Sequence, residues 1–313
     1  MGSRCATGND AALEVTPFRS HSVALRGLEC HVLTWGQPSA PKLFLLHGWM
    51  DVAASFQFLV DALKRDWYVI APDLRGYGKT AWQPQGYWYA DYIADLEALL
   101  DAFGRDEKVD LAGHSLGGNV VLHYAGVRPA RVRSVISLDG FGIRAEDARS
   151  APAKIAKWLD ALSLPQEFAP YASFDAVADR LQKNNRRLTR DKALFLARHW
   201  AEEDADGRVR LVSDPRHKLP FPTTYRIEET YAVWSTITAP VLWIAAEESN
   251  IPKWLDDRPE GESASDPLGG IRRRLAYIPN GRMVTIAAAG HMLHHDQPAA
   301  VAAAMEDFLA DLR

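Results

Sequence analysis

The pentapeptide Gly-His-Ser-Leu-Gly at residues 113–117 carries the strongest chemical signal in the sequence. A predicted strand precedes it and a predicted helix follows it. The two glycines leave room for a tight turn that lifts the hydroxyl of Ser115 above a sheet. The hydroxyl then stands at a helix N-terminus, where free N–H groups and the helix dipole favour a developing negative charge. This context predicts that Ser115 is a nucleophile.

A serine hydroxyl needs a general base before it can attack. The sequence has ten histidines, and His291 is the best candidate because it directly follows the last predicted strand, after Ala289 and Gly290. We predict that His291 takes the proton of Ser115, which is the chemistry of acyl transfer.

Four other histidines belong to the motifs around the predicted site. His294 and His295 follow one helical turn after the predicted base, and their nearest carboxylate is Asp296. This spacing matches no zinc pattern, so we predict no metal. For His47 and His114, which flank the site, we predict structural hydrogen bonding.

Acyl transfer also needs N–H donors for the oxyanion of the transition state. The residue after the nucleophile, Leu116, would supply one backbone N–H. The second donor should come from the loop after the apolar run at 42–46, and Trp49 is our choice. We expect the indole of Trp49 to line the pocket rather than to donate.

The elements that must position these residues alternate along the chain. Short apolar runs around 15–35 suggest an antiparallel hairpin, and amphipathic helices then alternate with continuously apolar strands. Alternation of this kind predicts a parallel sheet with right-handed crossovers. The predicted strands are 42–46, 67–71, 109–112, 132–138, 240–246 and 282–287, and the predicted helices cover 56–63, 89–103, 119–125 and 299–312.

The alternation stops between residues 141 and 235. This segment has no good strand, and helical stretches around 153–162, 174–183 and 191–202 are joined by proline-rich loops. We therefore predict a helical insertion at 141–235 and a core made of 1–140 and 236–313. We expect residues 1–12 to be disordered, and the polar stretch 247–270 reads as a lid edge or a surface loop.

The bulk composition excludes several classes of protein. The 313 residues carry a formal net charge of −4, from 36 basic and 40 acidic side chains, which favours neither nucleic acid nor an anionic membrane as a partner. No apolar run approaches the roughly 20 residues that span a membrane. The two cysteines, Cys5 and Cys30, imply no disulfide framework. Because the N-terminus also lacks the apolar core of a signal peptide, we expect a cytoplasmic protein.

Taken together, the motifs resemble the α/β-hydrolase superfamily from about residue 20 to 313. The stretches 47–56 and 138–142 look most like its serine hydrolase-like subgroup. The resemblance implies an α/β fold with a mostly parallel eight-stranded sheet flanked by helices, and a helical cap inserted after strand six, here 141–235. The motifs that carry it are His47-Gly48-Trp49, residues 73–78, residues 113–118, and Gly290-His291 followed by Pro298.

The resemblance leaves the acid of the catalytic triad open. Most members place an aspartate shortly after strand seven, but that position is Ser249 here. Other members place the acid after strand six, where Asp139 stands. We favour Asp139 because the end of a strand suits a fixed, partly buried carboxylate. Glu247 and Glu248, after strand seven, are the alternatives.

The resemblance also separates the reaction from those of two related groups. Dehalogenases and epoxide hydrolases have aspartate at the position of Ser115, so serine here implies an acyl-enzyme. Carboxylic ester hydrolysis without a cofactor is the default, and aromatic side chains in the cap suggest a small ester with an apolar moiety. The alternatives are a C–C or amide bond hydrolase with the same triad, or a catalytically weak ligand-binding protein. The cap aromatics in question are Trp158, Phe168, Tyr171 and Trp200.

Overall fold

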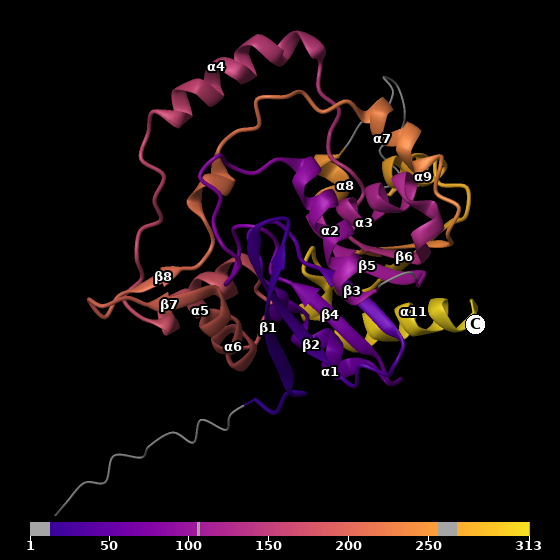
Figure 1. Cartoon of the computed structure of the whole chain (residues 1–313), viewed down its shortest axis with the longest axis horizontal. Helices are drawn as coiled ribbons and strands as arrows, with labels where there is room; N and C mark the ends of the chain where they lie inside the picture. The colour runs from indigo at the N-terminus through magenta and orange to yellow at the C-terminus, as the bar shows by residue number, and fades with distance from the viewer. Residues whose placement is uncertain (1–12, 105–106, 256–267, 313) are drawn as a thin grey trace, which may run out of the picture.

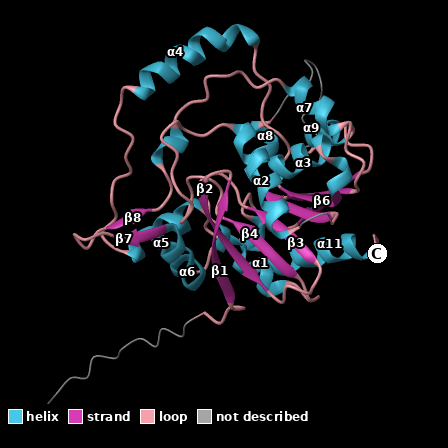
Figure 2. Ribbon diagram, viewed as in Figure 1, coloured by secondary structure: helices cyan, strands magenta, loops and turns pink. Residues whose placement is uncertain are grey.

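A computed structural model describes residues 13–104, 107–255 and 268–312. An eight-stranded sheet in the order β1-β2-β4-β3-β5-β6-β9-β10 forms its centre. β2 runs antiparallel to β1 and β4, and the remaining neighbours pair in parallel. Helices cover both faces (Figures 1 and 2). The strands are Phe18–Leu25, Leu28–Trp35, Lys42–Leu46 (β3), Tyr68–Pro72 (β4), Val109–His114 (β5), Val132–Leu138 (β6), Val241–Ala246 (β9) and Gly281–Ile286 (β10).

The sheet separates two hydrophobic clusters because side chains alternate along each strand. In β3, Phe44 and Leu46 pack into one cluster, and Leu43 and Leu45 pack into the other. The first cluster includes residues of α2 (Tyr89–Phe103) and α3 (Leu116–Val127), and the second includes residues of α1 (Gln57–Ala62) and α11 (Pro298–Ala310). Burial on both faces explains why the central strands are continuously apolar. The predicted fold class is confirmed.

The segment between β6 and β9 leaves the sheet. It contains α4 (Ala151–Leu162), α5 (Phe174–Asn184), α6 (Arg190–Trp200) and α7 (Ile227–Trp234). α5 and α6 share a small core of their own, whereas α7 packs against α3 of the main body. The proposed limits of the cap, 141 and 235, stay a prediction, and the contacts of α7 suggest that its last helix belongs with the core.

The prediction of no strand in this segment was wrong. β7 (Ala201–Glu203) and β8 (Val209–Leu211) form an antiparallel hairpin beside α6. The turn between them uses a left-handed glycine, Gly207, at φ 72°. Strands of three residues, rich in charge, are too short to display a period-two apolar pattern, so the sequence analysis missed them.

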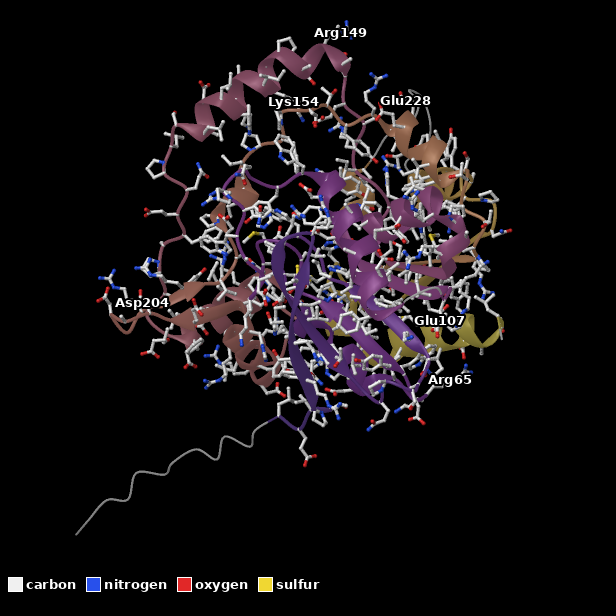
Figure 3. All side chains as sticks on the ribbon, viewed as in Figure 1. Arg65, Glu107, Arg149, Lys154, Asp204 and Glu228 are labelled. Atoms are coloured by element: carbon white, nitrogen blue, oxygen red, sulfur yellow. The ribbon has the colours of Figure 1, made fainter. Side chains whose placement is uncertain are left out.

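α4 stands apart from the rest of the chain. Figure 1 shows it arching above the body of the molecule, and none of its residues is buried. The apolar side chains of Ile155, Leu159 and Leu162 on this helix are exposed. Figure 3 labels Lys154 on this helix, and its ammonium pairs with Glu146 at 2.5 Å.

One short helix lies within the polar stretch 247–270 and a second begins at its end, where the sequence predicted none. They are α8 (Ile251–Trp254) and α9 (Gly269–Leu275), and residues 256–267 between them lie outside the described residues. Among the residues that the structure describes, no helix has both the length and the apolar surface that crossing a bilayer requires.

The two cysteines differ in what the structure says of them. Cys30 is a buried free thiol, and burial raises its pKa to about 12, which keeps it protonated and unreactive. Cys5 and the stretch 1–12, for which we predicted disorder, lie outside the described residues.

Candidate active site

Ser115 occupies a strained turn between β5 and α3. Its φ of 51° and ψ of −110° lie where non-glycine residues are rare. The backbone N–H of Ser115 donates to the carbonyl of Leu138 at 2.9 Å, which ties the turn to the end of β6. The strand–turn–helix arrangement expected from the pentapeptide is therefore present, with the serine at the start of a helix.

Two positions in this turn must be glycine because neither has room for a Cβ atom. A Cβ on Gly113 would lie 2.3 Å from the carbonyl carbon of Gly117, and a Cβ on Gly117 would lie 2.0 Å from the carbonyl oxygen of Leu46. Both distances are far below van der Waals contact. The elbow thus packs backbone against backbone.

We expect Gly117→Ala to lower the free energy of unfolding by about 3 kcal/mol or more, the upper end of overpacking costs. The matched control is Gly207→Ala in the β7–β8 turn. Its added Cβ meets nothing closer than 3.8 Å, so it should cost only about 1 to 2 kcal/mol for the left-handed backbone. Urea denaturation measures both, and equal losses would contradict the packing argument.

Asp139 accepts the hydrogen bond that a triad acid requires. It follows β6, is 1% exposed, and its Oδ2 lies 2.7 Å from Nδ1 of His291. The same Oδ2 accepts from the hydroxyl of Ser249 at 2.6 Å, and Oδ1 accepts from the backbone N–H of Ala246 at 3.2 Å. A neutral imidazole must carry its proton on Nδ1 to donate to a carboxylate, which leaves Nε2 of His291 as the basic nitrogen.

The alternative acids point elsewhere. Glu247 and Glu248 are both exposed. Glu247 accepts from the backbone N–H of Ala288 at 3.2 Å, and Glu248 forms an ion pair with Arg187 of the inserted segment. The geometry thus brings Asp139 rather than either glutamate to His291.

His291 lies beside the elbow. Its ring centroid is 4.7 Å from that of His114, the residue before the serine, and its carbonyl accepts from His114 Nε2 at 2.8 Å. Within the described residues, the hydroxyl of Ser115 makes no hydrogen bond. Proton transfer therefore requires the hydroxyl and Nε2 of His291 to close to about 2.6–3.2 Å when substrate binds.

The predicted oxyanion donors belong to the loop after β3 and to the start of α3. The N–H of Leu116 is the first of α3, and neither it nor the N–H of Trp49 finds an acceptor within the part of the chain that the structure describes. The loop of Trp49 lies against the elbow, since a Cβ on Gly48 would sit 3.3 Å from Cβ of Ser115.

His47 holds this loop through both ring nitrogens. Its Nε2 accepts from the N–H of Leu74 at 2.9 Å, so Nδ1 carries the proton and donates to the carbonyl of Gly48 at 2.8 Å. Burial lowers the pKa of His47 to about 4, which keeps the ring neutral. Its hydrogen bonding is structural.

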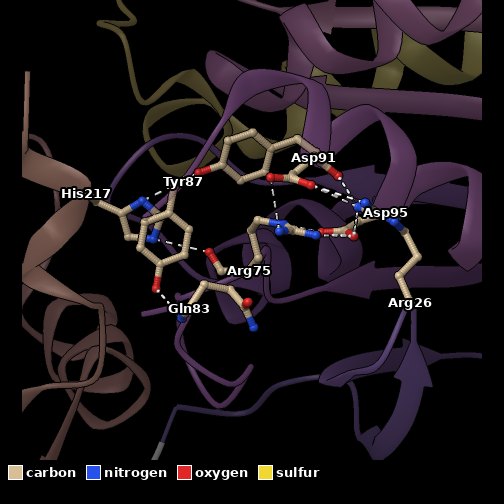
Figure 4. Close-up of polar contacts among 8 residues, drawn as sticks. Arg26, Arg75, Gln83, Tyr87, Asp91, Asp95 and His217 are labelled. Carbon is tan, nitrogen blue, oxygen red and sulfur yellow. Dashed lines mark hydrogen bonds and ion pairs between the residues drawn. The ribbon is translucent and has the colours of Figure 1, made fainter. Parts of the chain in front are cut away.

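The indole of Trp49 does donate, although to the protein rather than to a ligand. Its Nε1 donates to the carbonyl of His217 at 3.2 Å, and 54% of the side chain stays exposed. The ring of His217 stacks between Tyr77 and Tyr87, at centroid distances of 3.7 and 3.6 Å, and its Nε2 donates to the carbonyl of Arg75 at 3.1 Å (Figure 4). This bond connects the inserted segment to the loop of Trp49, which is the predicted oxyanion loop.

Two further histidines and an aspartate form a buried cluster near His114. Asp51, His294 and His295 are buried, and one possible ligand atom of each lies within 4.8 Å of the others. The hydroxyl of Ser55 sits among them, donating to Asp51 at 2.7 Å and lying 3.2 and 2.7 Å from the Nε2 atoms of His294 and His295. This hydroxyl links the three side chains to one another, and the absence of a metal stays a prediction.

The inserted segment also forms hydrogen bonds with this region. Trp200 of α6 donates through Nε1 to Asp51 at 3.1 Å. Asn185, which follows α5, donates to Asp296 at 2.7 Å, and the other oxygen of that carboxylate accepts from the N–H of Gly290 at 2.8 Å. Sequence analysis missed the roles of Asp51, Asp296 and Ser249. Only Ser249 carried a signal, because it stands where relatives have an acid.

The buried histidines predict a specific pH dependence of stability. Burial lowers the pKa of His217 and of His295 to about 3 and that of His47 to about 4, against about 6.5 when unfolded. Below pH 6.5 the unfolded chain therefore binds protons that the folded chain does not. The free energy of unfolding then decreases as the pH is lowered. Asp51, whose pKa burial raises to about 6, works in the opposite direction as a single group.

We expect a net loss on the order of 3 kcal/mol or more in the free energy of unfolding between pH 7 and pH 5. Urea denaturation at both pH values checks it. Added salt should leave most of the loss in place, because desolvation and not long-range charge causes it. A free energy that stays constant or increases over this range would contradict the assignment of neutral buried rings.

The chain as a whole is similar to known proteins in both sequence and fold. The family model described as the alpha/beta hydrolase fold matches residues 41–298. A serine hydrolase-like protein of Danio rerio is 25% identical over 283 residues, covering 88% of this chain and 83% of the relative. A hypothetical protein from Pseudomonas aeruginosa superposes with a TM-score of 0.80 at 26% identity, covering 93% of this chain and 99% of that one. The thioesterase domain from the curacin biosynthetic pathway superposes with a TM-score of 0.78 at 21% identity, over 93% of this chain and 99% of that domain.

Proposed function

The chain belongs to the α/β-hydrolase family and resembles its serine hydrolase-like proteins, and on that premise we propose that it hydrolyses carboxylic esters through an acyl-enzyme on Ser115. The observation that carries the proposal is the 2.7 Å contact between Asp139 Oδ2 and His291 Nδ1 beside the strained serine turn. A fixed carboxylate behind the imidazole is what makes a serine–histidine pair a proton-transfer device.

The proposed reaction has two steps. The hydroxyl of Ser115 attacks the carbonyl carbon of the ester while Nε2 of His291 takes its proton, and the imidazolium then protonates the departing alcohol. Water attacks the acyl-serine with its proton going to the same nitrogen, and the imidazolium then returns that proton to the oxygen of Ser115 as the carboxylic acid is released. Asp139 stabilises the imidazolium formed in both steps.

The oxyanion of each tetrahedral intermediate would lie between two backbone N–H groups, those of Trp49 and Leu116. Neither group is committed to an acceptor within the described residues, which supports this role. A donor of this kind typically contributes about 3 kcal/mol to the transition state.

Exposed tryptophans on the loop after β3 and just before α2 favour an apolar group on the substrate. Trp49 and Trp88 are 54% and 40% exposed, and Trp88 lies 6.4 Å from Trp158 of α4. Exposed aromatic rings can bind an acyl or alkyl chain by burying its surface. The proposed partner is therefore a small apolar ester. That the chain binds neither nucleic acid nor membrane, and acts in the cytoplasm, stays a prediction from the sequence.

A panel of p-nitrophenyl esters from acetate to laurate tests the proposal, together with fluorophosphonate labelling read by mass spectrometry. We expect turnover of at least one chain length and a single label on Ser115. Labelling without ester turnover would favour an amide or C–C bond as the substrate. The absence of both would favour a ligand-binding protein built on the same fold.

A further inference from the structure

We propose that His114 is a positioning residue that holds the loop of His291 against the nucleophile turn. The inference rests on the proposed function of His291 as the general base. His114 ends β5, directly before Ser115, so a bond from its ring joins the nucleophile's own strand to the loop that carries the base.

The bond itself is short and has one possible direction. Nε2 of His114 lies 2.8 Å from the carbonyl oxygen of His291, and a carbonyl only accepts, so Nε2 carries the proton. The ring is 2% exposed, and burial holds the pKa of His114 well below its usual range. The neutral ring therefore has its proton committed to the His291 loop.

The other nitrogen of His114 shows that local structure alone does not account for this histidine. Nδ1 is buried and finds no hydrogen-bond partner in the described residues. A buried unpaired acceptor is a free-energy cost that an apolar residue would not carry. His47, in contrast, uses both nitrogens to hold its loop. The bond to the His291 carbonyl is what His114 adds.

A rigid cluster supports the ring of His114 from behind. His294 packs against it at a centroid distance of 4.5 Å, and the Nε2 of His294 lies 3.2 Å from the hydroxyl of Ser55. That hydroxyl is held by Asp51 at 2.7 Å, and Trp200 of the inserted segment also donates to Asp51. Because His294 lies on the same segment as His291, this packing joins that segment to β5 at a second point and supports the bond to the His291 carbonyl.

Two amide variants test the inference because they differ by one methylene group. In His114→Gln the amide nitrogen reaches about as far as Nε2 of the imidazole, so it can still donate to the His291 carbonyl. In His114→Asn the amide is too short to do so. Both bury a neutral amide, so their unfolding free energies measure the structural cost that they share.

We expect His114→Asn to lower kcat about 10- to 100-fold with little change in KM, the loss that a misplacement near 1 Å produces. His114→Gln should stay close to the unaltered chain. The downfield NMR signal of His291 Nδ1–H, assigned by its loss in His291→Gln, should stay sharp in His114→Gln and broaden in His114→Asn. Equal signals in both variants would overturn the inference.

The NMR readout keeps this test separate from the proposed function. If the unaltered chain hydrolyses no ester, the proposed function fails, yet the Nδ1–H signals of the two variants still decide whether His114 positions the ring. If esters are hydrolysed and both variants match the unaltered chain in kcat and signal, the positioning role fails and the proposed function stands.

Discussion

Replacing Ser115 with alanine removes ester turnover and fluorophosphonate labelling together, with an expected loss in kcat on the order of 10⁶-fold. No other described residue pairs a strained strand–helix turn with an adjacent imidazole backed by a carboxylate. The substitution deletes one oxygen atom that accepts no hydrogen bond within the described residues, so the fold should be unaffected. Hydrolysis rates, intact-mass labelling and circular dichroism measure the three expectations.

The matched control is Ser163→Ala. Ser163 is an exposed serine that follows α4, and its hydroxyl bonds only to the carbonyl of Asp160 at 2.7 Å. This variant should keep full labelling and turnover. Substantial labelling of the Ser115→Ala chain would place the nucleophile elsewhere and remove the basis of the proposed reaction.

Replacing Asp139 with asparagine should lower kcat by about 10⁴-fold, as loss of a triad carboxylate does. An amide oxygen can accept from Nδ1 of His291, but it cannot stabilise the imidazolium, and the amide nitrogen can instead turn the ring to the wrong tautomer. Because Asp139 also bonds to Ser249 and Ala246, a modest loss of stability should accompany the kinetic one. Steady-state kinetics and urea denaturation separate the two effects.

Controls for this variant come from the neighbouring side chains. Glu247→Gln and Glu248→Gln should keep nearly full activity, because both carboxylates lie on the surface and bond elsewhere. Adding Ser249→Asp to Asp139→Asn should restore part of the activity, since the hydroxyl of Ser249 already lies 2.6 Å from the oxygen that His291 uses. A large loss in either glutamine variant would mean that the acid follows β9.

Some elements could be read from the sequence to the residue. β3, β6 and α2 have the bounds that their apolar patterns predict, because a strand buried on both faces is a continuous apolar run and a helix with one buried side shows a helical period. β7 and β8 escaped detection because hydrogen bonding, not burial of a repeated apolar face, holds so short a hairpin. α8 and α9 were also not predicted, because helices of four and seven residues are too short to show a helical apolar pattern.

The site divides in a similar way. Ser115 and its glycines are recognisable because backbone geometry permits few residues there, and that constraint is local. Asp51 and Ser55 meet His294 and His295 across about 240 residues of chain. No periodicity connects such positions. Their meeting follows from how the inserted helices and the last loop pack on the sheet, which only the folded chain reveals.

The two parts of the inserted segment answer to different constraints. Asn185 and Trp200 are bonded to Asp296 and Asp51 of the main body, whereas α4 contributes no buried residue to any core. Substitutions in α4 should therefore cost little folding free energy, while they change an exposed surface of the inserted segment. Selection for a new substrate can act on those twelve residues and leave the reaction chemistry untouched.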